Sequence, residues 1–165
     1  MSAKFTHFLF FTGAVIFFFS AAYLDLTLRA RSAYLEGEKY MAWAKEPALK
    51  KDFFENTFSA GLTALKNGRM EEGGRGDGFE DKKNLLLAEK NFKIGESSAK
   101  YAYIWYRTAG TDFSPPVTHW AGLARQKTPA ALALWRAELA LEGTRFDDNM
   151  LGVARPEPTA NHVRQ

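Results

Sequence analysis

The chain contains no cysteine, and this absence removes every kind of site that depends on a thiol. Disulfide frameworks, thiol nucleophiles, thiolate zinc or iron–sulfur centres and c-type haem attachment are therefore excluded. Histidine is scarce as well, since only His7, His119 and His162 are present. No nucleophile elbow and no HExxH spacing surrounds any of them. We expect no enzyme activity from this sequence.

A concentrated charge of one sign is also missing. The 165 residues include 22 Lys or Arg and 19 Asp or Glu, and both signs are spread along the chain. A basic side of one predicted helix is interleaved with Glu80, Asp81, Glu89 and Glu96; its members are Lys82, Lys83, Lys90, Lys93 and Lys100. Such a pattern is typical of a solvated helix face, so we expect no nucleic-acid partner.

What the chain does have is one long apolar run near its N-terminus. Residues 5–24 read FTHFLFFTGAVIFFFSAAYL and contain no Asp, Glu, Lys or Arg. Twenty residues of α-helix measure about 30 Å, the thickness of a bilayer's hydrocarbon core. A cleavable signal peptide is the alternative, because Ser20, Ala21 and Ala22 resemble a cleavage site. Since the run is longer than a signal peptide's apolar region, we predict an uncleaved signal-anchor over residues 1–27.

The orientation of this span follows from its flanks only weakly. Lys4 on one side is balanced by Arg29 and Arg31 on the other, so the distribution of positive charge does not decide. A short N-terminal tail before a larger polar part favours a cytoplasmic N-terminus. The bulk of the chain is then expected in the periplasm.

Small residues recur along the span and predict a helix-packing stripe. Gly, Ala, Ser and Thr let membrane helices approach closely, which is how helices associate in lipid. The alternative is a plain anchor in which these residues fall by chance. The predicted stripe consists of Thr6, Gly13, Ala14, Ser20, Ala21 and Thr27.

The remainder, residues 28–143, predicts an all-α domain of helical hairpins that resembles a tetratricopeptide stack in outline only. Apolar spacing and turn residues predict helices over 24–46, 47–67, 81–110, 114–123 and 128–143. In the third, Asp81 is the expected cap, and one face carries Leu85, Ala88, Phe92, Ala99, Ala102 and Tyr106. We expect a flexible glycine-rich loop over 68–78 and an extended or disordered tail over 144–165.

Two groups of residues remain as candidate sites. The aromatic residues between 101 and 120 predict either a partner-binding surface or a Tyr- and Trp-rich core. The set expected at the surface is Tyr101, Tyr103, Trp105, Phe113 and Trp120. Asp147, Asp148 and Asn149 suit a hard cation by chemistry but lack the spacing of a calcium loop. We predict no metal site and no cofactor.

Together these features predict a non-catalytic, single-pass accessory or scaffold subunit of a larger membrane protein complex. Its partners would be integral membrane subunits and the lipid bilayer, and an electron-transfer complex, respiratory or photosynthetic, is one host. Two alternatives stay open. One is a haem- or pigment-associated subunit with His7 or His119 as ligand, and the other is a free-standing envelope binding module.

Overall fold

The computed structural model describes residues 3–71, 78–114 and 117–144, with side chains from 10 to 68 in the first of these segments. The described residues form five helices and no strand, which confirms the predicted all-α class. The helices are α1 (Ala3–Lys45), α2 (Pro47–Glu71), α3 (Phe79–Gly95), α4 (Ser98–Thr111) and α5 (His119–Leu141).

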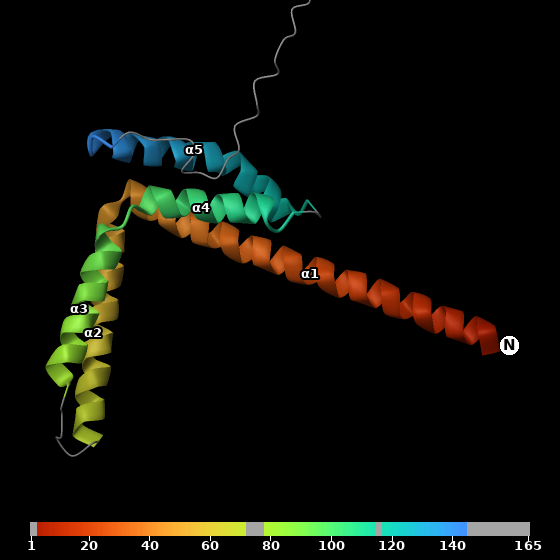
Figure 1. Ribbon diagram of the computed structural model, residues 1–165, viewed down its shortest axis with the longest axis horizontal. Helices are drawn as coiled ribbons and strands as arrows, with labels where there is room; N and C mark the ends of the chain where they lie inside the picture. The colour runs from red at the N-terminus through yellow and green to blue at the C-terminus, as the bar shows by residue number, and fades with distance from the viewer. Residues whose placement is uncertain (1–2, 72–77, 115–116, 145–165) are drawn as a thin grey trace, which may run out of the picture.

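Three of the helices form a packed body, and the other two project from it. The C-terminal half of α1 packs against α4 and α5, whereas α2 and α3 form a hairpin that leaves the body at a steep angle (Figure 1). We call these parts the body and the α2–α3 hairpin. The N-terminal half of α1 extends away from both, with no other helix beside it (Figure 1).

Small side chains bring the three helices of the body close together. Alanines that are completely buried come from each helix: Ala30 in α1, Ala102 in α4, and Ala121 and Ala124 in α5. Tyr106 is the one large side chain described as fully buried, and it fills the centre of the contact. Close backbone approach through alanine is how a short three-helix unit reaches native packing density.

Helix α1 is continuous from the apolar run into the body, as the sequence predicts. It ends at Lys45, directly before Glu46 and Pro47, because a residue that precedes proline is disfavoured in the α conformation. Proline then occupies the first turn of α2.

The end of α2 differs from the prediction. The helix does not stop at Asn67 and Gly68 but continues to Glu71. A glycine in a helix costs only about 1 kcal/mol, which the neighbouring helical turns can offset. The predicted loop over 68–78 is thus wrong for residues 68–71, which are helical. Residues 72–77 lie outside the described part. Gly78 adopts a left-handed conformation with φ of 92° directly before α3.

The predicted third helix is in fact two helices. The helical conformation is interrupted at Glu96 and Ser97. Ser97 caps α4 by accepting a hydrogen bond from the Lys100 backbone N–H at 3.0 Å. Asp81 is not the cap of α3, because Gly78 holds that place. The break also divides the predicted apolar face: the Leu85 and Phe92 side chains are 69% and 63% exposed, while Ala99, Ala102 and Tyr106 are buried.

The predicted fourth and fifth helices, by contrast, are one helix. Thr118 caps α5 by accepting a hydrogen bond from the Ala121 N–H at 3.2 Å. Pro129 lies inside this helix instead of beginning a new one. Proline in a helix interior removes a backbone hydrogen bond and kinks the helix, and α5 is visibly bent (Figure 1).

Helix α5 ends where glycine predicts. Gly143 has φ of 69°, and its N–H donates to the Ala140 carbonyl, while the Thr144 N–H donates to the Leu139 carbonyl. This is a Schellman motif, which satisfies carbonyls at a helix end. The predicted tail lies beyond Thr144, outside the described residues.

Candidate interaction surfaces

The N-terminal half of α1 is an exposed apolar cylinder. Phe17, Phe18 and Phe19 are exposed by 75%, 75% and 71%, and none of the most apolar window of this helix is buried. Within the described residues, α1 is the one helix long and apolar enough to span a membrane. Its lack of burial separates this segment from an ordinary core helix.

The predicted small-residue stripe lies on this same helix. Gly13, Ala14, Ser20 and Ala21 are exposed, and a Cβ added to Gly13 would meet nothing within 4 Å. The Thr27 hydroxyl donates to the Tyr23 carbonyl at 2.8 Å. The Thr6 and His7 side chains lie outside the described part. The packing role of these residues stays a prediction.

The five aromatic residues of the predicted partner surface divide in the structure. Tyr103 is buried, 5% exposed, with its ring centroid 5.8 Å from that of Trp135, so it is not a surface residue. Trp105, Phe113 and Trp120 are half-buried against the core. For these, the alternative prediction of an aromatic-rich core describes the observed packing.

Tyr101 is the fifth of this set and lies near the root of the α2–α3 hairpin. Its ring stacks on Tyr40 at 5.2 Å, and its hydroxyl donates to the Glu96 carboxylate at 2.7 Å. That hydrogen bond to the carboxylate, with some burial, raises the pKa of Tyr101 to about 12. The tyrosine thus joins α1 and α4 and remains half-exposed.

His119 and Trp120 form the other end of the body. The two rings meet edge to face at 5.5 Å, and the Trp120 ring also lies 5.5 Å from Tyr34. The Arg31 guanidinium stands over Trp120 at 5.7 Å. The Arg31–Trp120 pair is a cation–π contact between α1 and α5. The exposed His119 contacts the Trp120 ring by its edge-to-face geometry alone.

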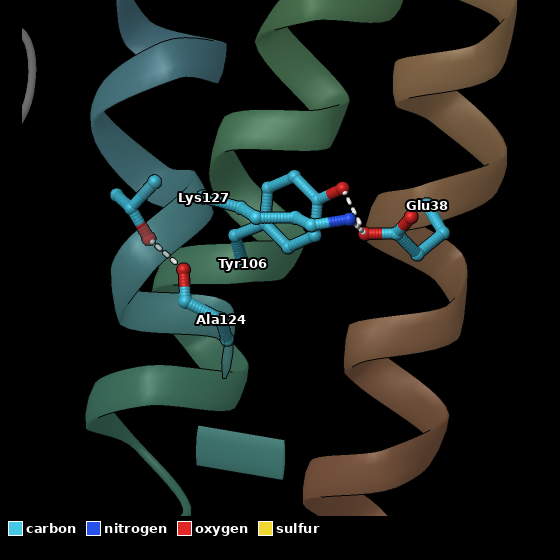
Figure 2. A network of polar contacts seen from close by, with 5 residues as sticks. Glu38, Tyr106, Ala124 and Lys127 are labelled. Atoms are coloured by element: carbon cyan, nitrogen blue, oxygen red, sulfur yellow. Dashed lines mark hydrogen bonds and ion pairs between the residues drawn. The ribbon is translucent and has the colours of Figure 1, made fainter. Parts of the chain in front are cut away.

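A polar network that the sequence did not reveal joins the three helices of the body (Figure 2). The buried Tyr106 hydroxyl donates to Glu38 Oε1 at 2.6 Å, and Lys127 Nζ donates to the same oxygen at 2.5 Å. Burial and this carboxylate raise the pKa of Tyr106, and the hydrogen bond to Glu38 raises the pKa of Lys127. One carboxylate from α1 therefore holds donors from α4 and α5.

A second polar cluster lies where the hairpin meets the body. Lys50 of α2 is only 5% exposed, and its Nζ donates to the Glu96 carbonyl at 2.5 Å. The Ser97 hydroxyl donates to the Glu138 carboxylate of α5. Burial lowers the pKa of Lys50, although Glu96 and Glu138 oppose that shift. We call this cluster the joint.

The joint borders a cavity of about 260 Å³ lined by Trp43, Lys50, Ser97, Glu138 and Glu142 among others. Within the described side chains no three His, Asp or Glu residues are grouped as metal ligands would be. His162 and the Asp147–Asn149 run lie outside the described residues. The polar side chains of the joint donate hydrogen bonds to other groups of the joint: Lys50 to the Glu96 carbonyl and Ser97 to Glu138. The cavity therefore lies at the packing contact between the hairpin and the body.

Comparison with protein-family models, with curated proteins and with solved structures gives no match for this chain. The sequence located the exposed apolar helix and, as the alternative to a partner surface, an aromatic-rich core between residues 101 and 120. It missed Glu38, Lys50 and Lys127, which look like solvated charges when only their spacing along a helix is considered.

Proposed function

We propose that the chain is a non-catalytic, single-pass accessory subunit that scaffolds a larger membrane protein complex. The observation that carries this proposal is the division of α1. Its first half exposes five phenylalanines, Phe10, Phe11, Phe17, Phe18 and Phe19. Its second half supplies the buried Ala30, Ala33 and Tyr34 of the body. One helix without a linker thus serves as anchor and as core element.

Continuity of α1 supports a scaffolding role because a helix transmits position and direction. From Leu24 to Lys45 the helix rises about 30 Å at its usual 1.5 Å per residue. An anchor over residues 5–24 therefore places the joint about 30 Å beyond the apolar run. The Glu38 network and the cation–π contact at Trp120 fix α4 and α5 on this support.

The α2–α3 hairpin supports binding to other subunits. No residue of α3 is buried, and Leu85 and Phe92 are exposed by 69% and 63%. Across the hairpin, α2 exposes half of the Phe53 side chain. Apolar exposure of this kind beside charged residues is typical of surfaces that bind protein. We place the first partner contact of the complex on this hairpin.

The compartment and the host complex belong to the same proposal. We place the body and the α2–α3 hairpin together on the periplasmic side of the membrane. An electron-transfer complex suits the phenylalanine-rich span, because such a helix packs against other apolar helices and membrane cofactors.

Purification of the tagged full chain in mild detergent tests the proposal. We expect integral membrane subunits in a fixed ratio, together with loss of these subunits when Leu85 and Phe92 are both replaced by Glu. The matched control replaces the exposed charged residues Glu80 and Lys82 by Ala, which leaves the apolar stripe intact. A monodisperse solitary chain before any substitution would contradict the accessory role, and partners retained in full by the doubly substituted chain would contradict the place of the contact.

A further inference from the structure

The end of the body that faces the apolar half of α1 is formed by the α4–α5 turn and the first residues of α5 (Figure 1). Arg31 of α1 contacts Trp120 of α5. Seven residues further along each helix, Glu38 accepts a hydrogen bond from Lys127. The two helices therefore run in the same direction, and residues that precede Trp120 lie nearer to the apolar run. We call this region the turn end, and it comprises Arg29, Arg31, Phe113, Val117, His119 and Trp120.

The distance of the turn end from the apolar run follows from the length of α1. Arg31 lies seven residues beyond Leu24, the last residue of the apolar run, which corresponds to about 10 Å of helix. Val117 precedes Trp120 and is therefore nearer to the run than Arg31 is. The polar headgroup layer extends about 5–8 Å beyond the hydrocarbon core on each side of a bilayer. An anchor over residues 5–24 thus places the turn end at the level of the headgroups.

The side chains of the turn end combine apolar and polar groups, as this level requires. Val117 is 66% exposed, and Phe113 and Trp120 are half-buried. Tryptophan is enriched where headgroups meet the hydrocarbon core, because its ring is apolar and its N–H is polar. The neighbouring His119 is exposed and polar. A bilayer surface can cover such a mixed patch without leaving its polar groups unpaired.

Arg31 is the cation of the turn end that has no acidic partner among the described residues. Its guanidinium lies 5.7 Å from the centre of the Trp120 ring. Arg29, by contrast, is paired with Asp25 at 2.7 Å. Asp112 of the turn accepts a hydrogen bond from the hydroxyl of the preceding threonine. A planar guanidinium matches a phosphate group, with which it forms two parallel hydrogen bonds.

We infer that the turn end binds the headgroup layer of the bilayer, with the Arg31 guanidinium on the phosphate of an anionic phospholipid and Val117 inserted between headgroups. The inference rests on the proposed anchor, because the apolar run sets the level of both residues. That level, the exposed valine and the cation without an acidic partner identify the occupant as lipid. The contact gives the body a second attachment beside the anchor and fixes its direction relative to the membrane.

Fluorescence quenching in phosphatidylcholine vesicles that hold the full chain tests the contact. The chain has no native cysteine, so the single substitution Val117→Cys carries the fluorophore. We expect a nitroxide on the lipid headgroup to quench this label and to leave a label at Leu141→Cys unquenched. Leu141 is the matched control, because it is 90% exposed and lies at the other end of α5, about 30 Å further from the apolar run. Equal quenching at both positions, or none at position 117, would overturn the contact.

The same label measures the preference for an anionic headgroup. Phosphatidylglycerol and phosphatidylcholine, each with a nitroxide at the same place high on the acyl chain, are compared as quenchers. We expect phosphatidylglycerol to associate about fivefold more strongly, the usual effect of one basic residue at a membrane surface. Arg31→Gln should remove this preference while quenching by the phosphatidylcholine probe persists, which shows that the body is intact. Lys51→Gln, at an exposed cation of α2, should retain it.

Two results would overturn the role of Arg31. One is equal quenching of the native chain by the two lipids, and the other is a phosphatidylglycerol preference that Arg31→Gln retains in full.

A label at Phe17→Cys separates this inference from the anchor. A nitroxide near the end of the acyl chain should quench it. Quenching at position 17 without quenching at position 117 leaves the anchor intact and refutes the headgroup contact. No quenching at position 17 refutes the anchor itself, and with it the level on which the contact depends.

Discussion

At the scale of single residues, the body depends on close approach between α1 and α4. A Cβ added to Gly37 would lie 2.6 Å from two ring carbons of Tyr106, closer than carbon atoms pack. Tyr106 cannot move easily, because it is fully buried and its hydroxyl is bonded to Glu38. This glycine therefore serves the contact and needs no unusual backbone angle.

We predict that Gly37→Ala lowers the free energy of unfolding by about 1–3 kcal/mol, the usual cost of overpacking. The matched control is Gly122→Ala in α5, where an added Cβ meets nothing within 4 Å. Alanine there should stabilise the helix by up to about 1 kcal/mol. Chemical unfolding of both variants in detergent measures the two effects, and equal effects would refute the role of the Gly37 contact.

The burial of Lys50 in the joint predicts that the free energy of unfolding depends on pH. Burial lowers the pKa of Lys50 below its ordinary value of 10.5, so the unfolded chain binds more protons than the native chain in the range just below 10.5. The free energy of unfolding contributed by Lys50 therefore rises as the pH increases toward 10.5.

The measurement compares the native chain with Lys50→Met from pH 7 to pH 10. We expect the stability of the native chain relative to Lys50→Met to increase over this range. The exposed neighbour Lys51 provides the control, since the same comparison with Lys51→Met should stay flat. A flat result for Lys50→Met as well would contradict the buried ammonium.

At the scale of elements, the break between α3 and α4 directs the hairpin away from the body. Ser97 holds this break through two hydrogen bonds, one accepted from the Lys100 N–H and one donated to Glu138. The N-cap bond satisfies a helix end, and the second bond ties the linker to α5. Ser97 thus ties the linker between α3 and α4 to both α4 and α5.

We predict that Ser97→Ala costs about 1–2 kcal/mol of stability, the typical loss of a serine N-cap with a further hydrogen bond. Ser59→Ala is the control, because that exposed hydroxyl donates only to the Asn56 carbonyl three residues before it. Thermal unfolding followed by circular dichroism compares them. Equal unfolding temperatures for Ser97→Ala and Ser59→Ala would show that Ser97 does not stabilise the linker between α3 and α4.

The helix boundaries show how much of the fold could be predicted from the sequence. Proline after Glu46 fixed the boundary between α1 and α2 correctly, because a residue before proline leaves the α conformation. The same reasoning failed at Pro129, where tertiary packing of α5 retains the helix across the proline. The sequence predicted one continuous helix across Ser97, yet Ser97 accepts a hydrogen bond from the Lys100 N–H and is the N-cap of α4.

Sites were less predictable than elements for a physical reason. Tyr103 and Trp105 lie two residues apart, about 200° around α4, and they differ in burial because α1 and α5 together determine which sides of α4 are covered. Glu38 and Lys127 lie 89 residues apart, so their pairing depends on packing that no local pattern encodes. The apolar run was predictable because its length alone carries the signal.

At the scale of the whole molecule, the shape assigns a role to each part. The apolar half of α1 is the proposed anchor, the body fixes its direction, and the α2–α3 hairpin presents exposed leucine and phenylalanine at a distance from the anchor (Figure 1). The network at Glu38 and the joint at Lys50 connect these parts. The proposed scaffolding role is based on this arrangement of the described helices.

The most direct test of the central claim is the accessibility of single cysteines in native membranes to a water-soluble maleimide. The account predicts that Phe17→Cys reacts only after detergent is added, because residue 17 lies inside the bilayer. Lys51→Cys, exposed on α2, should react at once when the reagent reaches its side of the membrane. Immediate reaction of Phe17→Cys in intact membranes would contradict the anchor and the scaffold built on it.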